Sequence, residues 1–184
     1  MARYVQDIEG LRAVLRITRS VLSGSTVLHI LDIQGSDAWA PQDLDVYSPI
    51  DTVRRMVHYL ITAEGYRLHQ IHDSTYQADG AGLRQVYSLV KGSCKIDVIQ
   101  STTLSALHPI PFFWGSHLMS YIGADTFCMP YPTLTLQGRG LMNPVALIDH
   151  RYAHKRTLDV MAKYRTRGYD FPEMYDITLF VYLC

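Results

Sequence analysis

The chain has 184 residues, and its 17 basic and 17 acidic side chains give a formal net charge of zero at pH 7. Neutrality argues against a nonspecific polyanion binder, although it leaves room for a local basic patch. Hydrophobic residues make up 48% and charged residues 18% of the chain, a charged fraction below the usual ~25%. This length and composition predict one domain with a sizeable core.

Apolar spacing predicts a helix over 7–19 and a short strand at 21–22. Gly24 then permits a tight turn, and either Ser23 or Ser25 can cap a helix that runs through Leu28 to Leu31. The stretch 32–42, DIQGSDAWAPQ, is typical of a loop. A strand over 43–47 follows, and its two acids should project from one face because strand side chains alternate.

The stretch Ser48-Pro49-Ile50-Asp51 has the pattern of a helix start, with Ser48 as the cap and Pro49 in the first helical position. The helix should end at Gly65. Its expected buried face consists of Val53, Met56, Val57, Leu60 and Ile61. A strand over 66–71 and a hairpin over 83–100, with Gly92-Ser93 as its two-residue turn, come next.

From Ser101 onward, prolines punctuate short segments. The stretch 112–123, FFWGSHLMSYIG, looks helical, and 143–165 favours one long helix or two. The expected fold class is α/β (α+β), a small mixed sheet flanked by helices. We expect a single domain over 1–184, with a core at about 20–100 and a helical layer at about 101–184.

Three acids are expected to converge. Asp43 and Asp45 share one strand face, and Asp97 lies on the far arm of the hairpin. If the two strands are neighbours, the three carboxylates can hold divalent cations, which stabilise an in-line displacement at phosphorus. The helix N-terminus after Gly24 and Ser25 suits a phosphate. A bare Asp-x-Asp pair is weak evidence, since most such pairs are solvated strand ends.

Other candidate ligands are weaker. His69 and His72 would lie on opposite faces of a strand, which is poor for one metal. His150 and His154 are one helical turn apart but have no obvious third ligand. Lys95 shares the face of Asp97, so it either offsets the acidic cluster or binds phosphate. The scattered Cys94, Cys128 and Cys184 predict neither a zinc site nor a disulfide framework.

The ordered set LSGS (22–25), DLDVY (43–47) and KIDVI (95–99) resembles the nucleotidyltransferase fold of the DNA polymerase beta type. The resemblance implies that Gly24 and Ser25 hold nucleotide phosphates and that Asp43 and Asp45 bind metal. It also implies that Asp97 completes the metal site and helps activate the acceptor hydroxyl. The implied cofactor is Mg²⁺ or Mn²⁺, and the implied substrate is a nucleoside triphosphate such as ATP.

The chain is also similar to fungal proteins of this fold without an assigned reaction. The shared stretches, from about 21 to 169, are SGSTVL, DLDVY, IQSTTLSAL, YPTLTL and KYRTRGY. One departure is the interval of seventeen residues (26–42) between Ser25 and Asp43. Gly35-Ser36 is an alternative phosphate turn, and the long interval leaves open whether the turn over 24–25 meets the acids.

The favoured hypothesis is an enzyme that transfers a nucleotidyl group to an unidentified acceptor, which is a protein, an RNA or a small molecule. The alternative is a catalytically inert binding or scaffold module, and a phosphate-ester hydrolase is a third class. The N-terminus MARYVQDIEG lacks a signal peptide, and no segment approaches the ~20 apolar residues of a membrane span. We therefore expect an intracellular protein, cytoplasmic or nuclear, without a membrane partner.

Overall fold

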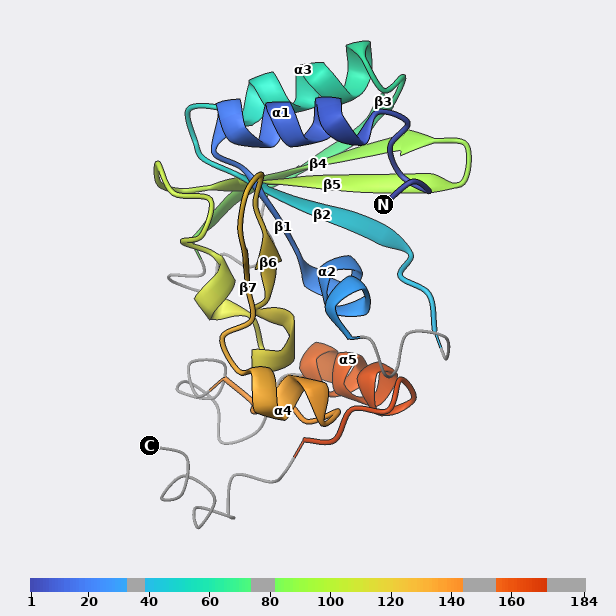
Figure 1. The fold of residues 1–184 in the computed structure, drawn as a ribbon, viewed down its shortest axis with the longest axis vertical. Helices are drawn as coiled ribbons and strands as arrows, with labels where there is room; N and C mark the ends of the chain where they lie inside the picture. Colours follow the sequence, from blue (N-terminus) through green and yellow to red (C-terminus); the bar gives the residue numbers. More distant parts are fainter. Residues whose placement is uncertain (33–38, 74–81, 144–154, 172–184) are drawn as a thin grey trace.

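Figure 1 shows the chain as a computed structural model, which describes residues 1–32, 39–73, 82–143 and 155–171. The described strands are Val21–Ser23 (β1), Asp43–Ser48 (β2), Arg67–Asp73 (β3), Leu83–Lys91 (β4), Cys94–Ser101 (β5), Tyr121–Ile122 (β6) and Phe127–Cys128 (β7). The described helices are Ile8–Thr18 (α1), Gly24–Leu31 (α2), Val53–Thr62 (α3), Pro132–Leu136 (α4) and Lys155–Arg165 (α5), with 3₁₀ turns at Ile110–Phe112 (η2) and Ser116–Leu118 (η3).

These strands form one mixed sheet of seven strands in the order β3-β4-β5-β2-β1-β6-β7. The β2–β5 pair is parallel, whereas the other neighbouring pairs are antiparallel. Helices flank this sheet, with α1 and α3 over one face and α2, α4 and α5 on the other side (Figure 1). The predicted α+β class, a mixed sheet flanked by helices, is confirmed.

The main core lies between the sheet and the α1–α3 layer. Alternate strand residues such as Leu44, Val46 and Ile96 are fully buried there, because every second side chain of a strand points to the same face. Helix α1 begins at the Asp7 cap, whose Oδ1 accepts a hydrogen bond from the Gly10 amide at 2.8 Å. This layer fixes the middle strands, which carry the acidic residues on their opposite face.

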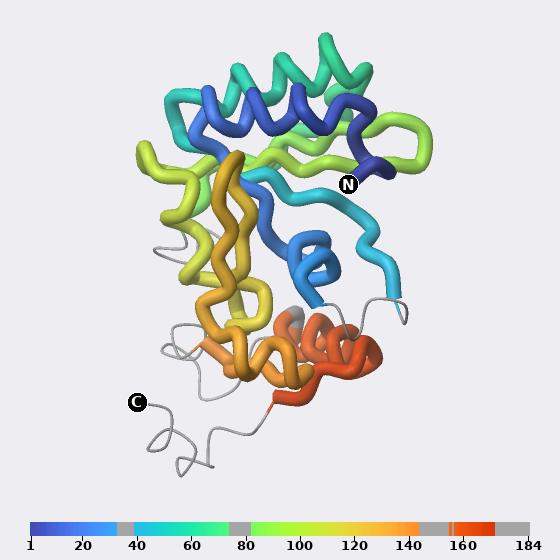
Figure 2. Tube along the Cα trace, in the orientation of Figure 1, coloured from blue at the N-terminus to red at the C-terminus, as the bar shows by residue number. Residues whose placement is uncertain are grey.

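The second core lies on the opposite side of the sheet. Figure 2 shows α5, from the end of the described chain, beside α2 from its beginning. Leu28 of α2 shares a buried cluster with Met161 and Tyr164 of α5. Packing in this cluster therefore brings two helices that are distant in sequence to the same end of β1 and β2.

The predicted start of the helix over 48–64 is wrong. Ser48 ends β2, where its hydroxyl lies 2.8 Å from the Ser20 hydroxyl, and α3 begins only at Val53. The intervening residues form a turn in which the Val53 amide donates to the Pro49 carbonyl at 3.1 Å. Ile61, expected in the buried face, is 39% exposed. The buried pairing of two hydroxyls outweighs the local capping pattern.

The predicted helix over 112–123 is also wrong. Gly115 has extended backbone angles and pairs with Met142, while the Asn143 amide donates to the Trp114 carbonyl at 2.8 Å. Bonds to a distant segment thus replace helical hydrogen bonds. Strands β6 and β7 also come from this half, so the expected layer over 101–184 is not helical throughout.

Of the helix expected over 143–165, the structure has Lys155–Arg165 as α5. Residues 144–154 of that prediction, with His150 and His154, lie outside the described residues. Among the described helices, none combines the length and the apolar character that crossing a bilayer requires.

Candidate metal centre

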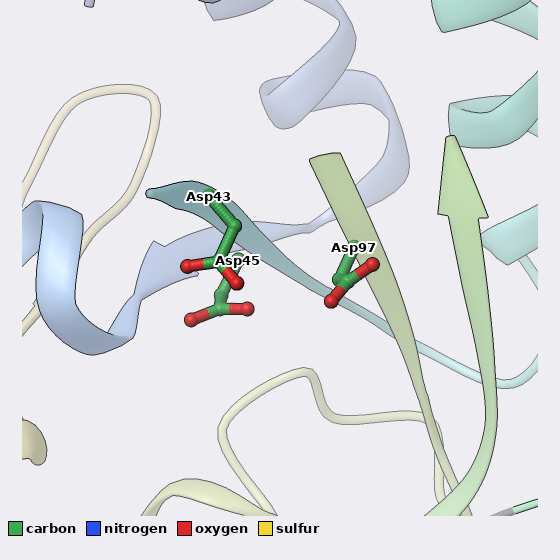
Figure 3. Close-up of side chains that lie close together, drawn as sticks. All are labelled: Asp43, Asp45 and Asp97. Atoms are coloured by element: carbon green, nitrogen blue, oxygen red, sulfur yellow. The ribbon is translucent and has the colours of Figure 1, made fainter. Parts of the chain in front are cut away.

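The parallel pairing of β2 with β5 brings the three acids together. Asp45 is the direct partner of Asp97, and Asp43 is the direct partner of Lys95. One carboxylate oxygen from each aspartate lies within 4.8 Å of the others, and all three side chains are half-buried. Figure 3 shows Asp43 and Asp45 on one strand and Asp97 on its neighbour. The proximity expected from the sequence is therefore present.

Two neighbours hold the Asp97 carboxylate in place. The Ser88 hydroxyl donates to Oδ1 at 2.6 Å, and the Lys95 ammonium donates to Oδ2 at 2.7 Å. With both oxygens bonded, the carboxylate keeps a fixed orientation toward Asp45. Ser88 was not expected at the site, although counting outward from the Gly92-Ser93 turn places it opposite Asp97.

Burial and neighbouring charges shift the pKa values of the cluster. Burial, followed by the charges of Asp43 and Asp97, raises the pKa of Asp45 well above its usual value. Burial lowers the pKa of Lys95, but its hydrogen bond to Asp97 and the nearby carboxylates outweigh this and hold the pKa above its usual value. A divalent cation would relieve this repulsion, because hard oxygen donors of like charge are the ligands that Mg²⁺ and Mn²⁺ favour.

The Gly24 turn lies directly against the acids. Ser23 pairs with Asp45 across β1 and β2. Gly24 has a φ of +74°, and a Cβ at this position would lie 2.3 Å from Asp45 Oδ2. Only glycine fits this approach without displacing the carboxylate. The long interval before Asp43 therefore does not separate the turn from the acids, and Gly35-Ser36 lies outside the described residues.

The N-terminus of α2 has no side-chain cap. Ser23 occupies the cap position but makes no capping hydrogen bond, because its hydroxyl donates to the Ser120 carbonyl at 2.8 Å. The amides of the first turn, which begins with Gly24 and Ser25, thus lack the usual side-chain acceptor. A helix start of this kind suits a phosphate oxygen.

Helix α5 supplies two further residues next to the site. Tyr164 is buried, which raises the pKa of its hydroxyl, and the positive charge of Arg167 together with the nearby Ser25 side chain opposes that rise. The exposed Lys163 lowers the pKa of Asp45 through its positive charge. Sequence reasoning placed both residues in KYRTRGY but gave them no role, because nothing local indicates that α5 packs beside α2.

Other candidates lie elsewhere. His69 and His72 are exposed on β3, and within the described parts of the chain only the three aspartates form a group placed to share an ion. A cavity of about 350 Å³ lies on the α3 side of the sheet. Its lining consists of Ile50, Asp51, Arg54, Arg84, Gln85, Tyr87 and Gln100. Tyr87 precedes Ser88 on β4, so this cavity and the acids occupy opposite faces.

Comparison with known proteins shows similarity of fold. No protein-family model matches the chain, and no curated protein matches its sequence. A solved structure described as a "tRNA-processing enzyme (apo form I)" aligns with a TM-score of 0.57 at 13% identity, covering 88% of this chain and 42% of that chain. This chain thus spans less than half of that enzyme's length. The fold of this protein is similar to that of part of a tRNA-processing enzyme.

Proposed function

We propose that this protein is a metal-dependent nucleotidyltransferase, which moves a nucleotidyl group from a nucleoside triphosphate such as ATP to an acceptor hydroxyl. One observation carries the proposal: three carboxylates with oxygens within 4.8 Å of one another lie against the uncapped start of α2. Together these two features can bind a nucleoside triphosphate. The acids hold cations, and the helix start holds the phosphates that leave.

Each residue then has a distinct role. Asp43 and Asp45 bind Mg²⁺ or Mn²⁺, and Asp97, oriented by Ser88, completes the metal site and accepts the proton of the acceptor hydroxyl. The bound cation would supply charge neutralisation for the phosphates. The first amides of α2, at Gly24 and Ser25, bind the outer phosphates.

Lys95 is proposed to bind phosphate once a cation occupies the acids. Its ammonium lies 2.7 Å from Asp97 Oδ2, and its side chain is 43% exposed. A cation bound by Asp97 would compete with this ion pair and free the ammonium. Lys95 would thereby balance charge in the free protein and contact the nucleotide in the complex.

Calorimetry of a nonhydrolysable ATP analogue with Mg²⁺ tests the proposal. We expect Asp43→Asn and Asp45→Asn each to abolish the Mg²⁺-dependent part of the binding. Glu9→Gln, which removes an exposed carboxylate of α1 on the other face of the sheet, is the matched control and should bind as the native protein does. Unchanged affinity in both aspartate variants would refute the assignment of the metal site.

A second candidate function is an inert binding module of the same fold. The Lys95–Asp97 ion pair favours it, because a lysine already neutralises part of the acidic cluster. Incubation with α-³²P-labelled triphosphates, Mn²⁺ and cell extract separates the possibilities. Transfer gives a labelled acceptor and pyrophosphate, hydrolysis gives free phosphate, and an inert module gives no labelled product with any base.

We also propose that residues 1–184 form a single domain. Strands from both halves of the chain form one sheet, and helix α1 packs in the core on one face of that sheet. A single unfolding transition in urea, followed at once by far-ultraviolet circular dichroism and tryptophan fluorescence, is expected. Two separate transitions would contradict this.

A further inference from the structure

The cavity behind the sheet has no part in the proposed reaction. Its volume of about 350 Å³ lies near the lower end of the ~300–1,000 Å³ that is usual for small-molecule sites. Its walls come from the turn before α3, the first turn of α3 and the strands β4 and β5. Because it lies on the face opposite the three acids, it is separate from the candidate metal centre.

Two arginines line this cavity from separate elements. Arg54 lies in the first turn of α3 and Arg84 lies on β4, and both are exposed. Neither forms an ion pair with any residue in the described parts of the chain. Guanidinium groups that border one space bind phosphate oxygens through charge-assisted hydrogen bonds. The two arginines therefore favour an anionic ligand.

The start of α3 adds positive potential at the same place. Thr52 occupies the cap position but makes no capping hydrogen bond, because its hydroxyl donates to the Thr18 carbonyl at 2.7 Å. Ile50 and Asp51, which precede this helix start, belong to the cavity lining. The positive end of the helix dipole thus lies at the cavity and adds to the attraction of the arginines for an anion.

Hydrogen bonds hold the β4 wall of the cavity. The Tyr87 hydroxyl donates to Gln85 Oε1 at 3.0 Å, and Gln85 Nε2 donates to Asp73 Oδ1 at 3.1 Å. Both ends of the Gln85 amide are therefore bonded within the protein. The contacts to a ligand fall to the two arginines and to Gln100, the other amide of the lining.

Two aspartates near the cavity are bonded to other side chains. Asp51 forms an ion pair with Arg19, whose Nη2 lies 2.6 Å from Asp51 Oδ2. Asp73 accepts the hydrogen bond from Gln85 described above. With Arg19 and the two arginines of the lining, three positive side chains face these two negative ones. The described surroundings of the cavity thus keep an excess of positive charge.

Gln100 adds a buried acceptor to the lining. This residue is 7% exposed, and its Nε2 donates to the Ile50 carbonyl at 3.2 Å. Its Oε1 is buried and has no hydrogen-bond partner in the part of the chain that the structure describes. Such atoms are rare, because buried polar groups in folded proteins are nearly always paired. A hydroxyl donor in the cavity would supply the missing hydrogen bond.

We propose that this cavity binds a small phosphate monoester that carries hydroxyl groups, such as a sugar phosphate. Arg54 and Arg84 bind the phosphate, and a hydroxyl of the same molecule donates to Gln100 Oε1. A phosphate monoester suits two arginines better than a carboxylate does, because it has about two negative charges and more acceptor oxygens. The inference is independent of the proposed function, since it uses no residue of the metal centre.

Calorimetry with ribose 5-phosphate and with inorganic phosphate, without metal or triphosphate, tests the inference. Ribose 5-phosphate should bind about fivefold more tightly than inorganic phosphate, which is the usual net worth of one neutral hydrogen bond. Arg84→Gln should weaken the binding of both about tenfold, the loss expected for one charge-assisted hydrogen bond. Because Arg84 is exposed, this substitution leaves the core undisturbed.

Arg55→Gln is the matched control. Arg55 follows Arg54 on α3 and is exposed, but it does not line the cavity. Both affinities should stay unchanged in this variant. Equal losses in Arg55→Gln and Arg84→Gln would overturn the inference, and so would a native protein that binds neither probe at millimolar concentration. Phosphate binding that is insensitive to Arg84→Gln would place the anion elsewhere, such as the start of α2, and would also overturn it.

Gln100→Met tests the hydroxyl contact. Methionine keeps the length of the side chain but removes the acceptor. We expect this variant to bind ribose 5-phosphate only as tightly as inorganic phosphate, while its affinity for inorganic phosphate stays native. A preference for ribose 5-phosphate that persists in Gln100→Met would overturn the assignment of Gln100.

Discussion

Replacing Gly24 by alanine should disable the site more than it destabilises the fold. Gly24 has a φ of +74°, and an added Cβ would lie 2.3 Å from Asp45 Oδ2. Ordinary contacts begin at 3.4 Å, so the carboxylate must retreat by about 1 Å. A displacement of this size can cost about 100-fold in catalysis. We expect Gly24→Ala to lose nucleotidyl transfer by about that factor.

Gly65 offers a matched control. It has the same φ of +74°, but nothing lies within 4 Å of its added Cβ. Both variants therefore incur the penalty of a left-handed alanine, about 1–2 kcal/mol in the free energy of unfolding. Only Gly24→Ala displaces the carboxylate of Asp45, a proposed metal ligand. Urea denaturation measures the shared penalty, and calorimetry with Mg²⁺ and a nonhydrolysable ATP analogue measures the difference.

Equal behaviour of the two variants would contradict this role of Gly24. If Gly24→Ala and Gly65→Ala lose the same stability and both retain native Mg²⁺-dependent nucleotide affinity, the Gly24 turn does not position Asp45 for metal. Loss of nucleotide binding by Gly65→Ala alone would likewise contradict it.

Three further predictions concern charge and hydrogen bonding. The pKa of Asp45 is raised in the folded protein, so the protein loses stability as the pH rises from the usual pKa of an aspartate through the raised pKa. Asp45→Asn removes this charge and should therefore raise the free energy of unfolding of the metal-free protein at neutral pH. In urea titrations, Mg²⁺ at 100 times its dissociation constant should add about 2.7 kcal/mol to the native protein and nothing to this variant. Burial lowers the pKa of His117 from 6.5 to about 3. The neutral imidazole therefore contributes its full share of the folding stability above pH 6.5, and this share is lost as the pH falls toward 3. Each pKa unit corresponds to about 1.4 kcal/mol. Between about pH 6.5 and 4.5, urea denaturation should therefore show that His117→Leu loses up to about 3 kcal/mol less stability than the native protein. Equal losses in the two proteins would contradict this. Tyr164→Phe removes a hydroxyl whose pKa burial raises and the Ser25 side chain, with Arg167, lowers, and we expect it to weaken nucleotide affinity in calorimetry; unchanged affinity would show that Tyr164 does not support the turn at Gly24-Ser25.

The core of the site follows from the sequence because it depends on local rules. Strand alternation places Asp43 and Asp45 on one face, and the two-residue turn at Gly92-Ser93 fixes where Asp97 lies on its hairpin. One step was an assumption, that β2 and β5 are neighbours. Parallel neighbours are chosen by the whole sheet, so no local pattern specifies them.

The errors arise where distant contacts override local patterns. Ser48 has the signature of a helix cap, yet it ends β2 and its hydroxyl pairs with that of Ser20, which precedes β1. The segment 112–123 has helical spacing, but its backbone bonds to residues near 142. Tyr164 shares a buried cluster with Leu28 only because α5 packs beside α2. Such contacts join segments far apart in the chain, which local propensity does not encode.

Anomalous diffraction from crystals soaked with Mn²⁺ and a nonhydrolysable ATP analogue would show whether the three aspartates bind a metal ion. We expect a manganese peak about 2.1 Å from carboxylate oxygens of Asp43 and Asp45, with Asp97 at the same site and the outer phosphates at the Gly24 end of α2. A nucleotide bound only in the cavity behind the sheet, or manganese that avoids these carboxylates at saturating concentration, would contradict this assignment.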